Sequence, residues 1–275
     1  VRSGGAYQPI DWRLDPMTGQ RFPGGFPHKA WQGSMTPPAS DIKWPWEIGR
    51  CQHWVTLGQA YRLTRDERYA AEIFHQHDDF MEANPIGVGV QFVCTMDVAI
   101  RALNWALAFE LVRESTAAAA AAGPAYRSLF ELGGFIEHNL ENKYEVTSNH
   151  FLSNVAGLYG IGVIFRDRPA GQRWLQQCRG WFEQEMRVQV LPDGADYESS
   201  IPYHRLVTEL FLCGERLAQL EGASLSAEYL ASLRRMMEFM VGVQRPDGLM
   251  PQVGDADDGR LHIFTDYGRW RSEEH

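Results

Sequence analysis

The chain has 275 residues, of which 44% are hydrophobic and 12% aromatic, and its formal net charge is −9. This composition can bury a sizeable core and excludes a disordered chain. The negative charge argues against a nucleic-acid partner, which normally selects a basic stripe, although a local cluster of donors can still bind an anionic substrate.

The sequence contains no apolar stretch long enough to predict a membrane span. The first residues, "VRSGGAYQPIDW", lack the basic and apolar regions of a signal peptide. The compartment is therefore not decided, with a periplasmic or secreted location favoured over a cytoplasmic one. The four cysteines are far apart and form no CxxC pair, so packed thiols are expected, with neither a metal nor a disulfide framework.

Residues 1–45 are rich in glycine and proline and carry scattered aromatic residues, among them Trp12, Phe22 and Trp31. Such a segment is too irregular for a helix and too apolar for a free linker. We expect an extended N-terminal arm that wraps on the core of the protein.

From residue 46 the apolar spacing is helical, as in Trp54, Leu57 and Tyr61. Breakers divide the pattern into segments of ordinary helix length, at "EANPIGVG", "AAGP", "RDRPAG", "LPDGAD" and "EGASLS". No alternating strand pattern precedes Gln244. Roughly eight helices joined by short loops predict an all-α stack of antiparallel hairpins. We expect this domain to cover residues 46–250 and residues 251–275 to form a junction.

Two pairs of polar residues stand at predicted helix starts. In "VTSNHFLSNVAGLYGIGVIF", Thr147 or Ser148 can cap a helix whose first turn holds Asn149 and His150. In "LPDGADYESSIPYHRLVTELF", Ser199 or Ser200 can cap a second helix, Pro202 suits its first turn, and Tyr203 and His204 follow. Helix starts favour anions, so two such starts at one cavity would make an anion site.

β-Elimination from a uronic acid needs this set of groups. Donors such as Asn149 and His150 can neutralise the carboxylate while the proton at C5 is removed. A tyrosine such as Tyr203 can serve as base and as acid to the leaving O4 when both lie on one side of the ring. Taken singly, each residue fits a cap or a packed polar side chain equally well.

Longer motifs are more specific. The stretches "DIKWPWEIGRCQHWVTLGQAYRLTRDERYA", "EANPIGVGVQFVCTMDVAIRALNWALAFEL", "SNHFLSNVAGLYGIGVIF" and "PDGADYESSIPYHRLVTELF" resemble the N-terminal helical domain of the heparinase II/III family of polysaccharide lyases. The resemblance runs from about Asp41 to about Phe211. It implies an incomplete (α/α) toroid followed by an antiparallel β-sandwich, and cleavage of uronate-containing acidic polysaccharides by β-elimination.

The resemblance also assigns roles. Asn149 matches the asparagine that neutralises the substrate carboxylate, His150 matches the adjacent histidine, and Tyr203 matches the tyrosine that acts as general acid and, in some members, as base. The family's remaining catalytic histidine, and the metal of some members, belong to the β-sandwich. No cofactor is therefore expected in this chain.

Further residues are candidates for sugar contacts, on the resemblance or on position: Trp44, Trp46, Arg50, Gln91, Arg101, Asn104, Trp105, Glu198 and His204. A packing role for the tryptophans and a buried pair between Glu47 and Arg101 stay open as alternatives. The family often has Asn-Trp where Gln91-Phe92 stand, and Glu where Asp97 stands. These departures leave the subsite contacts unassigned.

Two other chemistries compete with elimination. Asp193, Asp196 and Glu198 are spaced closely enough to suggest a carboxylate pair for glycoside hydrolysis, although "PDG" favours a turn for Asp193. His75 and Asp79 share one helical face and could hold a metal, although a solvated face is the simpler interpretation.

The chain ends at His275, where the sandwich of the family should begin. We therefore expect residues 1–275 to form one wall of the cleft and to have little or no activity alone. A non-catalytic carbohydrate-binding or polysaccharide-assembly protein and an (α/α) glycoside hydrolase remain alternatives to a lyase.

Overall fold

The structure is a computed structural model that describes residues 7–143, 145–256 and 259–264. Its α-helices within these ranges are α1 (Lys43–Gly49), α2 (Gln52–Thr64), α3 (Glu67–Ala83), α4 (Thr95–Val112), α5 (Thr116–His138), α6 (Asn149–Ile164), α7 (Pro169–Gln189), α8 (Ile201–Leu220) and α9 (Ala227–Val243). Three 3-10 turns, η1 (His28–Ala30), η2 (Gly33–Met35) and η3 (Val90–Phe92), complete the order. The described ranges contain only isolated β-bridges and no strand, which confirms the all-α prediction.

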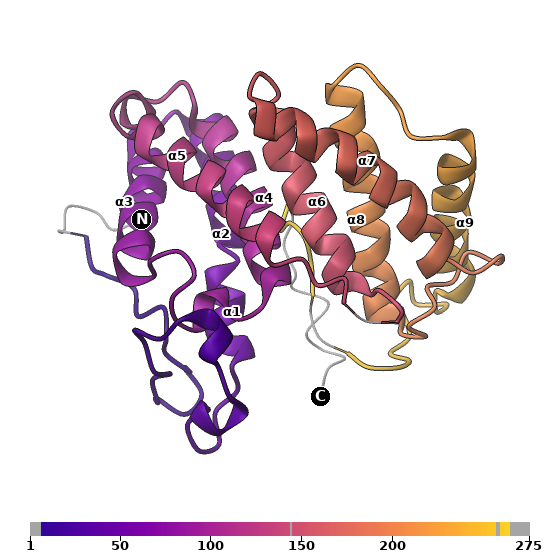
Figure 1. Cartoon of the computed structure of the whole chain (residues 1–275), viewed down its shortest axis with the longest axis horizontal. Helices are drawn as coiled ribbons and strands as arrows, with labels where there is room; N and C mark the ends of the chain where they lie inside the picture. Colours follow the sequence, from indigo (N-terminus) through magenta and orange to yellow (C-terminus); the bar gives the residue numbers. More distant parts are fainter. Residues whose placement is uncertain (1–6, 144, 257–258, 265–275) are drawn as a thin grey trace.

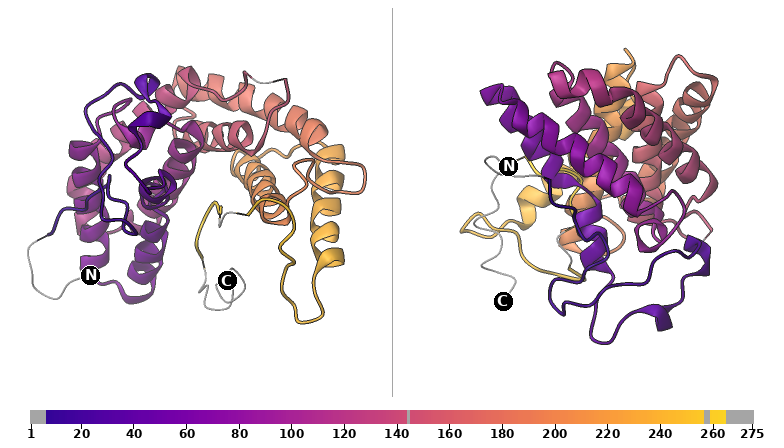
Figure 2. Two further views of the ribbon diagram at one scale, coloured as in Figure 1. Left: turned by 90° about the horizontal axis from the view of Figure 1, so that it is seen from below. Right: turned by 90° about the vertical axis from the view of Figure 1, so that its left-hand side faces the viewer.

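The helices form two rows of antiparallel hairpins (Figure 1). Helices α2, α4, α6 and α8 pack side by side in that order, and α3, α5, α7 and α9 lie against them on the outside. Figure 2 shows the rows curved into an open arch, as expected of an incomplete (α/α) toroid. Consecutive helices run in opposite directions, so the inner helices α4, α6 and α8 run parallel to one another. Their starts therefore lie at the same end of the inner row.

Serine caps define the two helix starts that the sequence singles out. Ser148 Oγ accepts from the backbone N–H of His150 at 3.3 Å, and Asn149 is the first residue of α6. Ser200 Oγ accepts from the backbone N–H of Tyr203 at 3.2 Å, with Pro202 in the first turn of α8. Each cap satisfies an N–H that has no partner within its helix, so the predicted starts are confirmed.

One predicted boundary is wrong. The stretch "AAGP" does not separate two helices, because α5 continues through the alanine run and past Pro124 to His138. Proline removes one N–H of the helical ladder, and the freed carbonyl is that of Ala120. Ala120 and Pro124 are both exposed, so water can solvate that carbonyl. High helix propensity on both sides and packing of α5 against α3, α4 and α6 keep the helix continuous.

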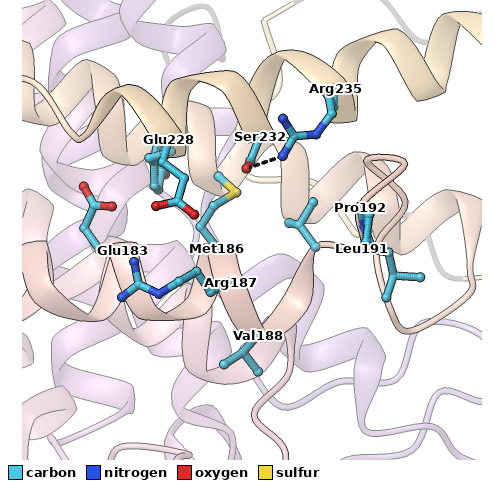
Figure 3. Close-up of a pocket in the computed structure, with 11 residues that line it drawn as sticks. Glu183, Met186, Arg187, Val188, Leu191, Pro192, Glu228, Ser232 and Arg235 are labelled. Atoms are coloured by element: carbon cyan, nitrogen blue, oxygen red, sulfur yellow. Dashed lines mark hydrogen bonds between the residues drawn. The ribbon is translucent and has the colours of Figure 1, made fainter.

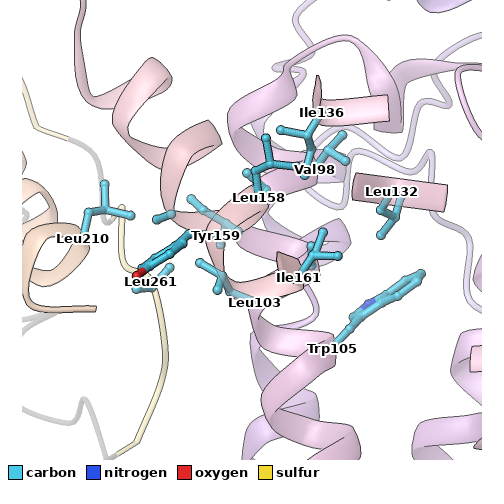
Figure 4. Close-up of a cluster of buried hydrophobic side chains, with 14 of the residues drawn as sticks. Val98, Leu103, Trp105, Leu132, Ile136, Leu158, Tyr159, Ile161, Leu210 and Leu261 are labelled. Atoms are coloured by element: carbon cyan, nitrogen blue, oxygen red, sulfur yellow. The ribbon is translucent and has the colours of Figure 1, made fainter. Parts of the chain in front are cut away.

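The core lies between the two rows (Figure 4). Trp105 of α4 is fully buried and stacks on Trp54 of α2 with ring centroids 5.2 Å apart. Where α6 crosses α4, a Cβ on Gly157 would lie 2.7 Å from the Cβ of Ala99. Glycine therefore lets these two central helices approach more closely than any other residue would.

Two irregular segments pack against the helices of the arch. The N-terminal segment is fixed by Asp79 of α3, whose Oδ2 accepts from Tyr7 Oη, Ile10 N and Trp12 Nε1 at 2.9–3.0 Å. The Tyr7 ring also lies against His75, with ring centroids 5.6 Å apart, so both residues of the suggested metal pair contact the N-terminal segment. Of the expected junction at 251–275, residues 257–258 and 265–275 lie outside the described ranges.

The described part of the C-terminal segment runs along the concave side of the arch (Figure 2). Residues 259–264 contact α2, α4 and α8, for example through the bond from Gln52 Nε2 to the carbonyl of Arg260 at 2.5 Å. Leu261 is buried there. This segment therefore covers part of the inner row.

Candidate functional site

A small cavity of about 70 Å³ lies at the common end of the inner helices. It is lined by Lys43, Trp46, Glu47, Arg50, Cys94, Met96, Asp97, Asn149, His150 and Tyr203. Its walls come from α1, from the start of α4, from the start of α6 and from the start of α8. The structure thus places Asn149, His150 and Tyr203 on one cavity.

Asn149 is held by Glu198, which belongs to the loop before α8. The backbone N–H of Asn149 donates to Glu198 Oε1 at 2.9 Å. Its side-chain Nδ2 donates to the same carboxylate, 2.9 Å from Oε1 and 3.0 Å from Oε2. Asn149 is buried, so this carboxylate fixes the direction of its amide. The free N–H groups of a helix start favour such an anionic partner.

The loop that carries Glu198 is itself bonded to the approach to α6. Tyr197 Oη donates to the carbonyl of Thr147 at 2.6 Å, and Gln189 Nε2 donates to the carbonyl of Ser148 at 3.1 Å. These bonds join the end of α7 and the loop before α8 to the first turn of α6. The relative placement of Asn149 and Tyr203 is therefore set by hydrogen bonds between residues that are far apart in sequence.

His150 is oriented by Glu141, a residue that the sequence analysis missed. Its Nδ1 lies 3.0 Å from Glu141 Oε1. Glu141 Oε2 accepts from the backbone N–H of Met96 at 2.8 Å and from Asn154 Nδ2 at 3.1 Å. Burial opposes charging of His150, but the hydrogen bond and charge of Glu141, helped by Asp97 and Glu198, raise its pKa above the usual value.

Tyr203 stands in the first turn of α8 and is half-buried. Its hydroxyl donates to Asp255 Oδ2 at 3.3 Å. Asp255 is brought there by the C-terminal segment, because Ser200 Oγ donates to the carbonyl of Asp255 at 2.5 Å and Ile201 N donates to that of Val253 at 2.9 Å. The phenol therefore meets both the cavity and an exposed carboxylate.

The opposite wall is made by an ion-pair network. Arg50 Nε donates to Asp97 Oδ1 at 2.6 Å, and Arg50 Nη1 lies 2.5 Å from Glu47 Oε1. Arg50 therefore pairs with Glu47, so the alternative pair between Glu47 and Arg101 is wrong. Beside this network, Trp46 Nε1 donates to the carbonyl of Val90 at 2.8 Å, which holds the indole against the cavity. Trp46 and Arg50 thus lie where sugar contacts are expected.

Gln91 and Arg101 do not line the cavity, contrary to expectation. Both are fully buried. Arg101 donates to the carbonyl of Gly49 at 2.5 Å and to Gln91 Oε1 at 2.7 Å, and its guanidinium lies 4.5 Å from the centroid of the Phe80 ring. Together they fix the junction between α1 and α2, where the absence of a Cβ on Gly49 leaves room for the Gln91 amide.

Asn104, Trp105 and His204 are also core residues rather than subsite residues. Asn104 Nδ2 donates to the carbonyl of Leu261 at 2.9 Å. His204 Nδ1 accepts from the backbone N–H of Asp196 at 3.0 Å, and its Nε2 lies 3.0 Å from the carbonyl of Met236. The polar atoms of Asn104 and His204 bond to backbone groups of other segments. The periodicity of a single sequence cannot distinguish such buried residues from residues that line a cavity.

The remaining candidates fall at the edges of the site. Trp44 is 43% exposed and does not line the cavity. Glu198 also lies outside the lining, yet it contacts Asn149 directly. Neither residue is placed where the cavity itself would bring it against a sugar ring.

The carboxylates proposed for hydrolysis are not arranged as a pair in this cavity. Asp193 Oδ1 accepts from the backbone N–H of Ala195 at 3.0 Å, in a turn with Gly194 at φ +93°, so the turn interpretation is confirmed. Asp196 is buried and does not line the cavity. Burial and the charge of Glu198 raise its pKa to about 7.

Larger hollows lie elsewhere. One of about 350 Å³ is lined by α7, the loop that follows it and α9, including Arg187, Glu228 and Arg235 (Figure 3). A second, of about 250 Å³, lies beside the loop before α6. None of the predicted catalytic residues lines either hollow. The smaller cavity, which holds all three, is therefore the candidate site.

Comparisons with known proteins identify the family to which the chain is similar. A family described as "Heparinase II/III N-terminus" matches residues 5–272. A heparin-sulfate lyase of Pedobacter heparinus is 26% identical over 229 residues, which are 80% of this chain and 34% of the relative. A heparin-sulfate lyase of Bacteroides stercoris is 24% identical over 280 residues, 89% of this chain and 41% of the relative.

Solved structures share the fold. Heparan sulfate lyase HepC from Pedobacter heparinus has a TM-score of 0.60 and 22% identity, covering 83% of this chain and 38% of that one. A heparinase III has a TM-score of 0.67 and 20% identity, covering 77% and 33%. A variant of alginate lyase A1-III complexed with a tetrasaccharide has a TM-score of 0.56 and 18% identity, covering 74% and 59%.

The comparisons cover only part of each curated relative. The chain spans only about a third to two fifths of the length of the curated relatives described above. In the described residues, no helix is both long and apolar enough to cross a membrane.

Proposed function

The chain belongs to the heparinase II/III family, matching its N-terminal part, and we propose that it forms one wall of the active site of a polysaccharide lyase. The proposed substrates are acidic glycans that contain uronic acids. The names of the curated relatives favour a heparan-type glycan among them. The proposed reaction is β-elimination at the uronate.

The observation that carries the proposal is the convergence of Asn149, His150 and Tyr203 on one cavity. They come from two helices and are as many as fifty-four positions apart in sequence. A packing role would not require all three to face the same small space. Elimination does require donors for a carboxylate and a proton-transferring group within reach of one sugar ring.

In the proposed reaction a base removes the proton at C5, and its electrons form the bond between C4 and C5. The bond from C4 to O4 breaks, and O4 takes a proton as it leaves. Charge grows on the uronate carboxylate during the first step, so donors from Asn149 and His150 at the start of α6 would stabilise it. In this proposal Tyr203 moves the proton, as base, as acid or as both.

The Asn149 amide already donates a hydrogen bond to Glu198, so its contact with a substrate would use its remaining hydrogen. An amide nitrogen carries two hydrogens, and a carboxylate on one side leaves the second hydrogen for a substrate. Glu198 would then keep the amide oriented before substrate arrives. Preorganised donors of this kind stabilise a transition state without a reorganisation cost.

Product chemistry tests the proposal. The whole protein, including any sequence that adjoins residues 1–275, is incubated with heparan sulfate, with alginate and with a neutral glucan as the control. Elimination generates a double bond between C4 and C5 that absorbs in the ultraviolet, whereas hydrolysis adds water and generates none. We expect new ultraviolet absorbance with a uronate glycan only. Cleavage without that absorbance, or binding without cleavage, would support one of the two alternatives instead.

A further inference from the structure

Three side chains with metal-ligating atoms meet beside the cavity, from segments far apart in sequence. Cys94 precedes α4, Glu141 follows α5, and His150 is in the first turn of α6. Cys94 Sγ lies 3.9 Å from Glu141 Oε1 and 3.8 Å from His150 Nδ1. Glu141 Oε1 and His150 Nδ1 are 3.0 Å apart. No sequence motif predicts this cluster, because only the fold brings its three residues together.

We propose that Cys94, Glu141 and His150 form a binding site for a thiophilic divalent cation, with Zn²⁺ as the ion it fits best. The fourth coordination position would face the cavity. The site shares His150 with the proposed elimination chemistry, but its occupancy can be measured whether or not the protein cleaves a glycan.

The ligand separations agree with a tetrahedral zinc site. From the usual zinc–ligand distances, tetrahedral geometry places sulfur about 3.6 Å from the nitrogen and from the oxygen, and nitrogen about 3.4 Å from oxygen. The three separations in the structure are 3.8, 3.9 and 3.0 Å. Side-chain shifts of a few tenths of an ångström would therefore complete the site without moving the backbone.

The ligands are also supported as metal ligands usually are. The second oxygen of Glu141 is fixed by the backbone N–H of Met96 and by Asn154 Nδ2. The backbone N–H of Glu141 donates in turn to Asn154 Oδ1 at 2.8 Å. Such outer contacts hold a ligand in place and leave its other oxygen for the ion. Cys94 and His150 both line the cavity, which gives the ion an entry path and an open position.

The local charge is compatible with a cation. Asp97 and Glu198 lie close enough to affect the imidazole of His150 electrostatically, as does Glu141. The cations that line the same cavity are Lys43 and Arg50, and Arg50 is paired with Asp97 and Glu47. The anions therefore outnumber the cations around the cluster.

The donor set selects the type of ion. Mg²⁺ and Ca²⁺ prefer sites made of oxygen atoms alone, whereas a thiolate with an imidazole favours zinc and similar metals. Binding requires that the Cys94 thiol lose its proton and that His150 Nδ1 present a lone pair. Binding should therefore release protons and strengthen as the pH rises.

The test is a titration of the whole, untagged, metal-free protein with Zn²⁺ by calorimetry, and with Co²⁺ by absorbance. The variants are Cys94→Ser, which removes the sulfur, and His150→Gln, which removes the ring nitrogen. Cys213→Ser is the matched control, because Cys213 is a free thiol in α8 that does not line the cavity. Thermal melts establish that each variant is folded before it is titrated.

We expect one tight Zn²⁺ site per chain, weakened at least about tenfold in Cys94→Ser and in His150→Gln and unchanged in Cys213→Ser. Co²⁺ should give a sulfur-to-metal charge-transfer band in the wild type and in Cys213→Ser, and none in Cys94→Ser. The proposal is overturned if the wild type binds Zn²⁺ no more tightly than folded Cys94→Ser does, or if the charge-transfer band survives that substitution.

Discussion

The side-chain Nδ2 of Asn149 lies 2.9 Å from Oε1 and 3.0 Å from Oε2 of Glu198, forty-nine positions further along the chain. The backbone N–H of Asn149 donates to the same carboxylate. One acidic side chain thus links the start of α6 to the loop that leads into α8. This contact couples the proposed carboxylate-binding residue to the helix that carries the proposed proton-transfer residue.

We expect Asn149→Ala to lower the turnover number of elimination by about two to three orders of magnitude, with a smaller change in KM. The reason is that the lost donor matters most when charge develops on the substrate carboxylate. Initial rates over a range of glycan concentrations separate the two constants. A change confined to KM would mean that Asn149 only helps to bind the ground state.

Glu198→Ala should leave the Asn149 amide in the protein but without the partner that orients it. We expect turnover to fall by up to about a hundredfold. Glu198→Gln is the matched control, because it keeps one oxygen acceptor for Asn149 and should lose less activity. If both substitutions leave turnover at the wild-type value, Glu198 does not position the amide.

The substitution Trp105→Ala should destabilise the protein rather than weaken glycan binding. Trp105 is fully buried and stacks on Trp54, so its removal leaves a large cavity and should cost about 3–5 kcal/mol of the free energy of unfolding. Trp44→Ala is the matched control, because Trp44 is 43% exposed and should change stability by less than about 1 kcal/mol. Denaturant unfolding of both variants measures the difference. Equal stabilities would contradict the burial of Trp105.

Asp196 should make the protein less stable as the pH rises. Its folded-state pKa is raised from 3.8 to about 7, because burial and the nearby charge of Glu198 outweigh the opposing effect of the backbone N–H groups of Tyr197 and Glu198. Between these two values the folded state holds a proton that the unfolded state has lost, so the free energy of unfolding falls as pH rises through this window.

The substitution Asp196→Asn should remove that dependence. We expect the variant to be more stable than the wild type by about 2–4 kcal/mol at pH 8 or so, with the difference vanishing below a pH of about 4. Asp193→Asn is the control, since Asp193 is exposed in its turn. Urea unfolding across this pH range measures both. A constant difference between Asp196→Asn and the wild type would show that Asp196 does not titrate in this way.

Much of the helical architecture follows from local patterns. The starts of α6 and α8 were predictable, because a serine precedes each helix and a cap acts on the nearest turn. The convergence of Asn149 and Tyr203 could be expected from these starts and from the order of the family motifs. The continuation of α5 past Pro124 could not, because it depends on packing against other helices and on the exposure of one carbonyl.

The lining of the site was less predictable than its position. Arg101, Asn104 and Trp105 lie on α4, which is buried on nearly all sides, so the sequence gives no polar face that would separate core from cavity. Gln91 and His204 are polar yet buried, since their partners are backbone groups of distant segments. Glu141 was missed because its role depends on contacts with His150, Met96 and Asn154 that only the fold creates.

The most direct measurement of the central claim is the initial rate of double-bond formation by Tyr203→Phe, compared with the wild type on the same uronate glycan. The substitution removes the hydroxyl and keeps the ring, so the cavity wall should persist. We predict that turnover falls by about two to four orders of magnitude while glycan affinity changes little. Elimination by Tyr203→Phe at the wild-type rate would contradict the assignment of proton transfer to Tyr203.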